Sequence, residues 1–317
     1  MKARGQPKAS RRRDKVLTAL GRARVRRHGE ALARTGLAPL FVIGAGRSGN
    51  TLVRRVLMAT GEIYIPPETY VLGDIIEGWP RGALLTWQER VWLFCAYFEK
   101  HHSFSTFGFN NLDEFARLAC ALPRAERTLP ALIDAFYRNL AAAHGLEGAR
   151  WGDKTPYNTF HLDALEAVFP SARFLWLVRD GRDVALSYVE AGLFDTLGEA
   201  AGRWVEANAA CTALAQRHPR VRRQSYEALV SAPEEVFADL CAWAELTFAP
   251  AMLTAPIAPL GDVETLDHHR NVTRPISAAS VGRWRSTVDP DAFDELPAEF
   301  WAMMDAVGYE RSGGDGE

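Results

Sequence analysis

Two short segments that each run from an apolar strand through a polar turn into a helix constrain the fold of this chain most. They occupy residues 40–51 (LFVIGAGRSGNT) and residues 174–187 (FLWLVRDGRDVALS). Their all-apolar starts are typical of parallel strands buried on both faces. A glycine-rich turn before a helix can bind a phosphate through backbone N–H groups. The second segment offers Arg179 and Ser187 to another phosphate, so a ligand with two separated phosphates is expected.

Strands and helices are expected to alternate, which predicts an α/β, P-loop-like three-layer fold with a central parallel sheet. Apolar runs predict strands at residues 40–43, 62–65, 150–154, 174–178 and 221–226, and helical patterns predict helices at 50–60, 159–169, 181–191, 197–217 and 291–306. Ser231 is expected to cap one more helix, with a proline and acids in its first turn. Residues 84–146 read as an aromatic-rich helical insertion that helps to shape an acceptor pocket.

The helix predicted at residues 50–60 has an expected orientation. Helical spacing places Leu52, Val56 and Leu57 on one apolar face. The same spacing directs Arg54 and Arg55 away from that face. The pattern predicts that the apolar face packs on the sheet.

Charge divides the chain into a basic arm at residues 1–39, a domain at residues 40–310 and a disordered tail at residues 311–317. The arm carries 12 Lys/Arg and 2 acidic residues, a net +10, whereas the remainder carries 25 and 37, a net −12. A basic arm by itself supports only non-specific attraction to anions. The arm is therefore expected to be a solvated, partly frayed helix, without a specific nucleic-acid partner.

Composition narrows the protein class. The chain has 317 residues, 48% of them hydrophobic, and can bury a full core. It lacks a run of 18 apolar residues, and Val16–Leu20 is too short for a secretory signal, so neither a transmembrane helix nor a signal peptide is expected. The cysteines are far apart and form no CxxC pair, which favours reduced thiols and a cytoplasmic location. They are Cys95, Cys120, Cys211 and Cys241.

The turn at residues 44–51 almost fits the ATP-binding pattern GxxxxGK[ST], but Asn50 occupies the position of the phosphate-binding lysine. Backbone N–H groups can still bind an anion there, and the positive charge lies three positions earlier, at Arg47. One alternative is therefore an ATP- or GTP-dependent phosphotransferase with a degenerate P-loop. The residues expected to contact the anion are Gly46, Arg47, Ser48, Gly49, Asn50 and Thr51.

Arg179 is predicted at the carboxyl end of a parallel strand, where open α/β sheets bind ligands. Ser187 follows eight residues later, one to two turns into the next helix. The two side chains can converge on one phosphate from two sides. Taken singly, Arg179 could instead pair with Asp180 or Asp183, and Ser187 could be an ordinary helix residue.

Four stretches in this order resemble the sulfotransferase family over about residues 40–285. They are the turn Gly-x-x-Arg-Ser-Gly-x-Thr at residues 44–51, the run Val-Arg-Asp-x-Arg-Asp-Val-Ala-x-Ser-Tyr at residues 178–188, Ser225-Tyr-Glu-Ala-Leu, and Val281-Gly-Arg-Trp-Arg285. Members of this family use 3'-phosphoadenosine 5'-phosphosulfate (PAPS) and release adenosine 3',5'-bisphosphate. The chain is thus expected to transfer a sulfuryl group to a hydroxyl or amine by in-line displacement, without a metal.

The resemblance also implies roles for individual residues. Residues 47–51 would hold the 5'-phosphosulfate, and Arg179 with Ser187 the 3'-phosphate. Tyr226 would approach the adenine, and the loop that carries Arg283 would close over the 3'-phosphate. Two residues depart from the family pattern: Asn50 replaces a common threonine, and Val53 replaces an adenine-stacking tryptophan of many cytosolic members.

Catalysis needs a cation at the leaving oxygen and a base at the acceptor. Arg47 suits the first role because it is permanently charged, and Lys154 in Asp-Lys-Thr-Pro is the second candidate cation. Glu68, after Pro66-Pro67, is the expected base, because a carboxylate is ionised at neutral pH. Tyrosylprotein-type and some carbohydrate-type members pair a loop arginine with a glutamate in this way. His101 and His102 are the competing bases.

The acceptor remains open among small molecules, carbohydrates, lipids and peptides, and the sequence leaves the oligomeric state open as well. Aromatic residues between 84 and 146 are compatible with a ring-bearing acceptor, but they serve equally as core. A second alternative is a non-enzymatic protein that uses the basic arm to bind nucleic acid or a membrane.

Overall fold

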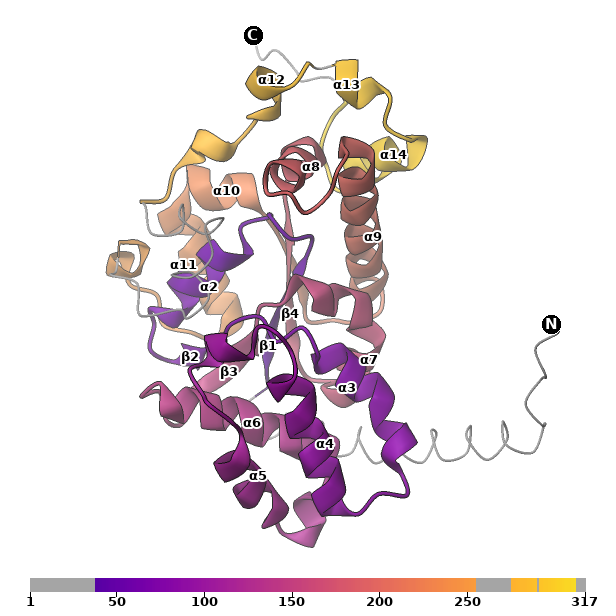
Figure 1. Cartoon of the computed structure of the whole chain (residues 1–317). Helices are drawn as coiled ribbons and strands as arrows, with labels where there is room; N and C mark the ends of the chain where they lie inside the picture. Colours follow the sequence, from indigo (N-terminus) through magenta and orange to yellow (C-terminus); the bar gives the residue numbers. More distant parts are fainter. Residues whose placement is uncertain (1–37, 255–274, 290, 312–317) are drawn as a thin grey trace, which may run out of the picture.

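The central sheet is all parallel, as the alternation of strands and helices predicts. The computed structural model describes residues 38–254, 275–289 and 291–311. Five strands pair in the order β2-β3-β1-β4-β5 (Figure 1). They are β1 (Leu40–Gly44), β2 (Ile63–Tyr64), β3 (Arg150–Asp153), β4 (Arg173–Val178) and β5 (Val221–Ser225). The predicted α/β fold and its five strands are confirmed.

Thirteen α-helices are described in this part of the chain, together with short 3-10 turns. They are α2 (Asn50–Met58), α3 (Leu72–Gly78), α4 (Trp87–Glu99), α5 (Asp113–Cys120), α6 (Leu129–Ala143), α7 (Leu162–Val168), α8 (Gly181–Glu190), α9 (Leu197–Ala215), α10 (Tyr226–Ser231), α11 (Pro233–Ala244), α12 (Trp284–Thr287), α13 (Asp291–Asp294) and α14 (Ala298–Ala306).

Alternating side chains of the buried strands divide the core into two halves. Leu40 and Val42 of β1 pack with apolar side chains of α2, α10 and α11. Phe41 and Ile43 point to the opposite face, where they join apolar residues of α3, α7, α8 and α9. Because successive side chains of a strand face opposite sides, an all-apolar strand needs helices on both faces. The result is a three-layer arrangement of helix, sheet and helix (Figure 1).

The segment between β2 and β3 folds into α3, α4, α5 and α6 with connecting turns, and α4, α5 and α6 lie below the sheet in the view of Figure 1. Its buried aromatic residues pack on one another and extend the core on that face of the sheet: the tilted rings of Phe98 and Phe136 have centroids 4.3 Å apart, and those of Phe94 and Phe136 are 5.5 Å apart. Trp92 and Tyr97, in contrast, are 45% and 37% exposed.

The two arginines that the helical pattern directs away from the apolar face of α2 are not exposed to solvent. Arg54 and Arg55 are both buried. The Nε atom of Arg54 donates to the carbonyl oxygen of Ile65 at 2.8 Å, and Nη2 of Arg55 donates to that of Leu253 at 3.2 Å. The chain covers α2 on its outer side as well as on the sheet side, so the helix is enclosed rather than amphipathic toward solvent.

Two predicted helix boundaries also differ. The helix expected to start from Ser231 begins at Pro233 with Ala232 as its N-cap, because Ser231 ends the separate short helix α10. The helix predicted at residues 291–306 is divided into α13 and α14, with Pro297 as the N-cap of the second. Proline cannot donate the N–H bond that a continuous helix needs.

The basic arm, apart from residues 38–39, and residues 312–317 of the expected tail lie outside the described residues. Within the described part of the chain, we find no helix whose length and hydropathy would suit a membrane span.

Candidate active site at the carboxyl edge of the sheet

Three adjacent strands deliver the predicted site residues to one edge of the sheet. The glycine turn follows β1, Lys154 follows β3, and Arg179 follows β4. Because β3 and β4 both pair with β1 in parallel, their carboxyl ends meet around the turn. This edge is where open α/β sheets bind ligands.

The turn between β1 and α2 reverses by means of left-handed backbone conformations. Gly44 has φ 119°, Gly49 has φ 90°, and Arg47 has φ 65°. Glycine adopts positive φ without steric cost, whereas arginine in this region is strained. A strained residue held in such a turn is a common feature of functional sites.

Two glycines of the turn face tyrosine rings at close range. A Cβ atom at Gly46 would lie 2.8 Å from the hydroxyl oxygen of Tyr188. A Cβ atom at Gly49 would lie 2.6 Å from Cδ2 of Tyr226. Both positions therefore require glycine, because the tyrosines already fill the space beside the turn.

The turn and the first residues of α2 retain polar groups suited to an anion. Helix α2 has no side-chain cap and no acidic residue in its first turn, so its first N–H groups have no competing carboxylate there. Ser48 is fully buried, and its Oγ atom has no protein partner among the described residues. Asn50 donates from Nδ2 to the carbonyl oxygen of Ala45 at 3.1 Å and so braces the turn. Thr51 is buried in the first turn of the helix.

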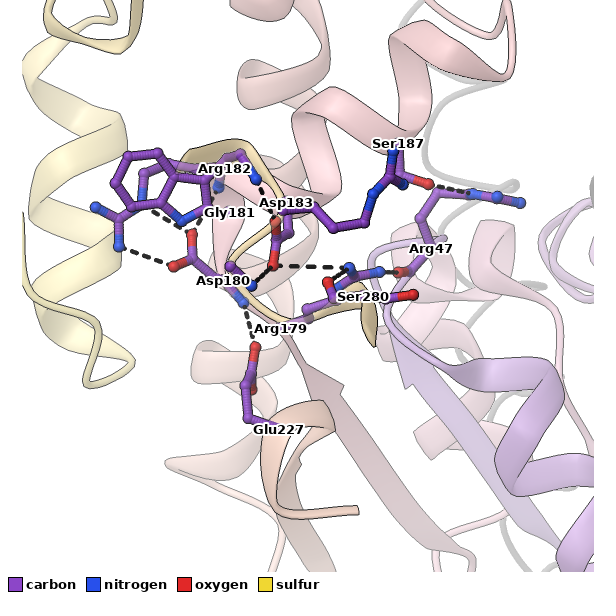
Figure 2. A network of polar contacts seen from close by, with 12 residues as sticks. Arg47, Arg179, Asp180, Gly181, Arg182, Asp183, Ser187, Glu227 and Ser280 are labelled. Carbon is purple, nitrogen blue, oxygen red and sulfur yellow. Dashed lines mark hydrogen bonds and ion pairs between the residues drawn. The ribbon is translucent and has the colours of Figure 1, made fainter. Parts of the chain in front are cut away.

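Arg47 connects the first predicted phosphate motif to the second. Its Nε atom donates to Oγ of Ser187 at 3.0 Å, and its carbonyl oxygen accepts from Nη1 of Arg179 at 3.0 Å (Figure 2). Burial, followed by the charge of Arg179, lowers the pKa of Arg47. The two segments that the sequence separates by more than a hundred residues thus lie in direct contact.

Arg179 is nearly buried and is held from several sides. Its Nη2 atom donates to the carbonyl oxygen of Ser280 and lies 3.7 Å from Oδ2 of Asp183 (Figure 2). The guanidinium carbon lies 4.5 Å from the ring centre of Tyr226, within cation–π distance. The Nε atom has no protein partner among the described residues. The ion pair to Asp183, one alternative from the sequence, is therefore present in addition to the predicted placement.

Asp183 also fixes the segment that carries Arg283. Its carboxylate accepts from the backbone N–H groups of Gly282 at 2.7 Å and Trp284 at 3.0 Å. The side chain of Arg283 does not join the Arg179 group, because it forms two bonds with the Glu190 carboxylate, at 2.7 and 3.2 Å. The Arg283 side chain thus contacts the last residue of α8, the helix that also carries Ser187.

Glu68 and Lys154, the predicted base and second cation, form an ion pair. Nζ of Lys154 donates to Oε1 of Glu68 at 2.6 Å; the lysine side chain is fully buried and the glutamate side chain is 17% exposed. Glu68 also lies close enough to Arg47 for its negative charge to raise the pKa of that arginine, against the larger effect of burial. The predicted catalytic residues are therefore grouped, with Glu68 as a partly exposed carboxylate near two cations.

The competing bases lie beside the same loop. The ring of His101 stacks on Tyr70 with centroids 5.1 Å apart, and His102 lies 6.3 Å from that ring. Burial and the neighbouring His102 lower the pKa of His101, so its ring is neutral at pH 7. Across the described residues, no three histidine, cysteine or acidic side chains are arranged to hold a metal ion.

Sequence reasoning assigned no role to Tyr188 and considered Asp183 only as an ion-pair partner of Arg179. Burial raises the pKa of Tyr188 to about 12, so its hydroxyl stays neutral beside Gly46. The glycine at position 46 was the available signal, since a required glycine implies a close neighbour. Val53 is fully buried against the sheet, within the cluster of β1 side chains, and so offers no surface to a base ring.

The fold and this site define a P-loop-like α/β protein in which a glycine-rich turn and Arg179 lie together at the carboxyl edge of the sheet. Residues 39–250 match the sulfotransferase family. The chain belongs to that family and is a sulfotransferase. Family membership implies PAPS as the sulfuryl donor.

Similar proteins agree with this assignment. The chain is 23% identical to human protein-tyrosine sulfotransferase 1 over 287 residues, which cover 86% of this chain and 69% of the human one. It is 24% identical to the Drosophila melanogaster protein-tyrosine sulfotransferase over 288 residues, 86% of this chain and 51% of that protein. The sulfotransferase domain of the Synechococcus PCC 7002 olefin synthase superposes with a TM-score of 0.58 at 23% identity, covering 86% of this chain and 94% of that domain. The sulfotransferase domain from the curacin biosynthetic pathway also superposes with a TM-score of 0.58, at 20% identity. That match covers 86% of this chain and 98% of that domain.

Proposed function

We propose that this sulfotransferase binds PAPS between the glycine turn and the second motif, and that Glu68 activates a hydroxyl or amine acceptor. The contact of Arg47 with both Ser187 and Arg179 carries the proposal. Two anion-binding motifs that meet can hold one nucleotide with phosphates on both its 5' and its 3' side. A ligand with a single phosphate group would use only one of them.

The polar groups present fit such a nucleotide. Ser48 Oγ and Arg179 Nε are buried donors without a protein partner in the part of the chain that the structure describes, and unpaired buried donors are rare in native proteins. A phosphate oxygen would satisfy each of them. The turn supplies backbone N–H groups at the helix start, and Tyr226 presents a ring beside Gly49 and Arg179. In this assignment Ser48 to Thr51 hold the 5' side, and Arg179 with Ser187 the 3' side.

Arg283 has a different place from the one the family pattern implies. Its two bonds to Glu190 leave it outside the group around Arg179. We therefore assign the closure over the 3' side to the backbone of its loop, which Asp183 fastens through Gly282 and Trp284.

The chemistry then depends on three side chains. Bound PAPS supplies the sulfuryl group and leaves as adenosine 3',5'-bisphosphate. Arg47 stabilises the negative charge that develops on the leaving phosphate. Glu68 accepts the acceptor's proton through Oε2, because Oε1 is bonded to Lys154. Lys154, fully buried, holds this carboxylate in one orientation.

Binding of adenosine 3',5'-bisphosphate to three variants tests the proposal. We expect Arg47→Ala and Arg179→Ala each to weaken binding in calorimetry. We expect Glu68→Gln to lose turnover with labelled PAPS but to bind the bisphosphate as the wild type does. Unchanged binding in both arginine variants would refute the nucleotide site, and full turnover in Glu68→Gln would transfer the base role to His101 or His102.

The ATP- or GTP-dependent alternative is separated by a panel of nucleotides in a thermal-shift assay. A ligand that binds only the folded state raises its stability by RT ln(1 + [L]/Kd). The amide of Asn50 is bonded to Ala45, where a P-loop would offer a lysine to the phosphates. We expect adenosine 3',5'-bisphosphate to raise the melting temperature more than ATP or GTP at equal concentration.

A further inference from the structure

A cluster of buried polar side chains lies directly behind the Glu68–Lys154 pair and has no role in the mechanism above. Its members are at most 1% exposed: Thr69, Tyr137, Asp153, Thr155 and Asn158. Asp153 is the centre. Its Oδ2 atom accepts from the Tyr137 hydroxyl at 2.5 Å and from the Thr69 hydroxyl at 2.9 Å, and its Oδ1 atom accepts from Nδ2 of Asn158 at 2.8 Å.

Such a centre is costly to bury. Burial raises the pKa of Asp153, because the charged carboxylate is removed from water. Tyrosine, threonine and asparagine offset that cost only through hydrogen bonds, since they carry no positive charge. Both carboxylate oxygens of Asp153 accept hydrogen bonds from buried side chains, and such bonds make the local structure rigid. This cluster lies at the end of β3 next to Lys154, and its position indicates which part of the structure it stabilises.

The cluster joins the end of β3 to the loop that carries Glu68. Thr69 follows Glu68, and its backbone N–H donates to Oγ1 of Thr155 at 2.9 Å. Glu68 itself bonds Lys154, the residue between Asp153 and Thr155. Neighbouring residues of the loop thus contact neighbouring residues of the strand end, so Glu68 cannot move without disturbing the bonds of Thr69.

The backbone after Thr69 needs such a support. Tyr70 has φ 52°, a left-handed conformation that is strained for a tyrosine. The N–H group of Val71 closes a tight turn by donating to the carbonyl oxygen of Thr69 at 2.5 Å. A strained turn persists only where surrounding contacts determine it. The side-chain and backbone bonds of Thr69 supply those contacts.

We propose that Thr69 and Asp153 are positioning residues that hold the loop of Glu68 against the end of β3 and so aim its carboxylate at the acceptor. They act through Glu68 and touch neither donor nor acceptor. This inference rests on the proposed role of Glu68 as the base.

The test compares Thr69→Val, which removes only the hydroxyl at nearly constant volume, with Thr69→Ser, which keeps it. We expect Thr69→Val to lower kcat by on the order of tenfold or more, because small displacements of a catalytic group have large effects on rate. The KM for PAPS and the Kd for adenosine 3',5'-bisphosphate should stay unchanged. Thr69→Ser should keep most of the wild-type kcat, because it retains the hydroxyl. Equal kcat values in the wild type and Thr69→Val would overturn the inference.

A double-mutant cycle identifies the residue through which Thr69 acts. In the Glu68→Gln background, Thr69→Val should have no further effect on single-turnover rate, because the group that it aims is already absent. The same loss in both backgrounds would show a general structural role and overturn the inference, while the base assignment would stand. Full activity of Glu68→Gln alone would instead overturn the proposed base and this inference with it.

Asp153→Asn provides a second variant if Thr69→Val folds poorly. One amide oxygen can still accept from Thr69 and Tyr137, and Asn158 can turn its amide because its Oδ1 atom has no protein partner among the described residues. We expect Asp153→Asn to keep a higher kcat than Asp153→Ala, which removes both acceptor oxygens, since the bond and not the charge holds the loop. Inactive but folded Asp153→Asn would contradict this reading.

Discussion

Nε of Arg47 and Oγ of Ser187 form a hydrogen bond of 3.0 Å, although the two residues are 140 positions apart in the chain. One residue comes from the left-handed turn after β1 and the other from the second turn of α8. The two side chains satisfy each other through this bond. A bound phosphate would have to compete with this bond, so both residues can report on ligand binding.

The first prediction separates the two ends of the nucleotide. We expect Ser187→Ala to weaken binding of adenosine 3',5'-bisphosphate about tenfold, because a hydrogen bond to a charged group contributes about 1.5–3 kcal/mol and 1.4 kcal/mol corresponds to tenfold. Binding of adenosine 5'-monophosphate, which lacks the 3'-phosphate, should be unaffected. Calorimetry with both nucleotides measures the difference, with the exposed Ser231→Ala as control. Equal weakening for both would place Ser187 at the 5' side.

The second prediction concerns Gly46. A methyl group there would meet the Tyr188 hydroxyl at 2.8 Å and displace the turn. We expect Gly46→Ala to weaken binding of the bisphosphate, and Gly46→Ala with Tyr188→Phe to recover part of the affinity, since the double variant removes the obstructing oxygen. Tyr188→Phe alone is the control. A double variant no better than Gly46→Ala would show that the clash is not the cause.

The third prediction tests how Asp183 fastens the segment after residue 275. Asp183→Asn replaces one acceptor oxygen by an N–H donor that faces a backbone N–H, which costs about 1–3 kcal/mol for a buried group left without a partner. We expect faster trypsin cleavage after Arg285, followed by mass spectrometry, and weaker bisphosphate binding. Asp195→Asn, at an exposed position, should digest like the wild type. Identical cleavage rates for both variants would contradict the role of Asp183.

The fourth prediction follows from His218, far from the site at the other end of β4. Its Nδ1 atom accepts from the N–H of Arg220 at 3.2 Å, and Nε2 pairs with the carbonyl oxygen of Pro170 at 3.2 Å, so the ring is neutral. Burial lowers its pKa from the ordinary value of 6.5. Below about pH 6.5 the His218 ring binds a proton more readily in the unfolded chain than in the folded one. The free energy of unfolding therefore decreases as the pH is lowered.

Urea unfolding at pH 7.5 and 5.5 checks this sign. The wild type should lose more stability over that interval than His218→Gln, which has no titrating ring. An equal loss in both proteins would mean that His218 does not contribute.

The fifth prediction concerns the thiols, all of which are free. Burial raises the pKa of Cys95 to about 12 and that of Cys241 to about 11, and it also raises that of Cys211. Only Cys120 is partly exposed. At pH 8 we expect a thiol reagent to modify Cys120 first and the others only after unfolding, because the thiolate is the reactive form. Rapid modification of more than one thiol in the native protein would contradict this.

The sequence predicted the sheet and the turn well because both depend on local patterns. All-apolar runs such as Phe174–Val178 can only be parallel strands between helices, and a Gly-rich turn after one of them has few uses. The contacts between segments distant in the sequence were harder to predict. The Glu68–Lys154 ion pair, the bond of Arg283 to Glu190 and the burial of Arg54 depend on which loops meet in space, and no local spacing encodes that.

The order of the strands has a consequence for how such an enzyme can diversify. Every side chain assigned to the donor comes from the ends of β1, β4 and β5 or from the helices directly after them, and none comes from α4, α5 or α6. Mutations on the solvent-facing sides of those three helices would leave the donor-binding side chains and the Tyr137–Asp153 bond in place. Related enzymes can therefore acquire new acceptors while the residues that carry out sulfuryl transfer stay the same.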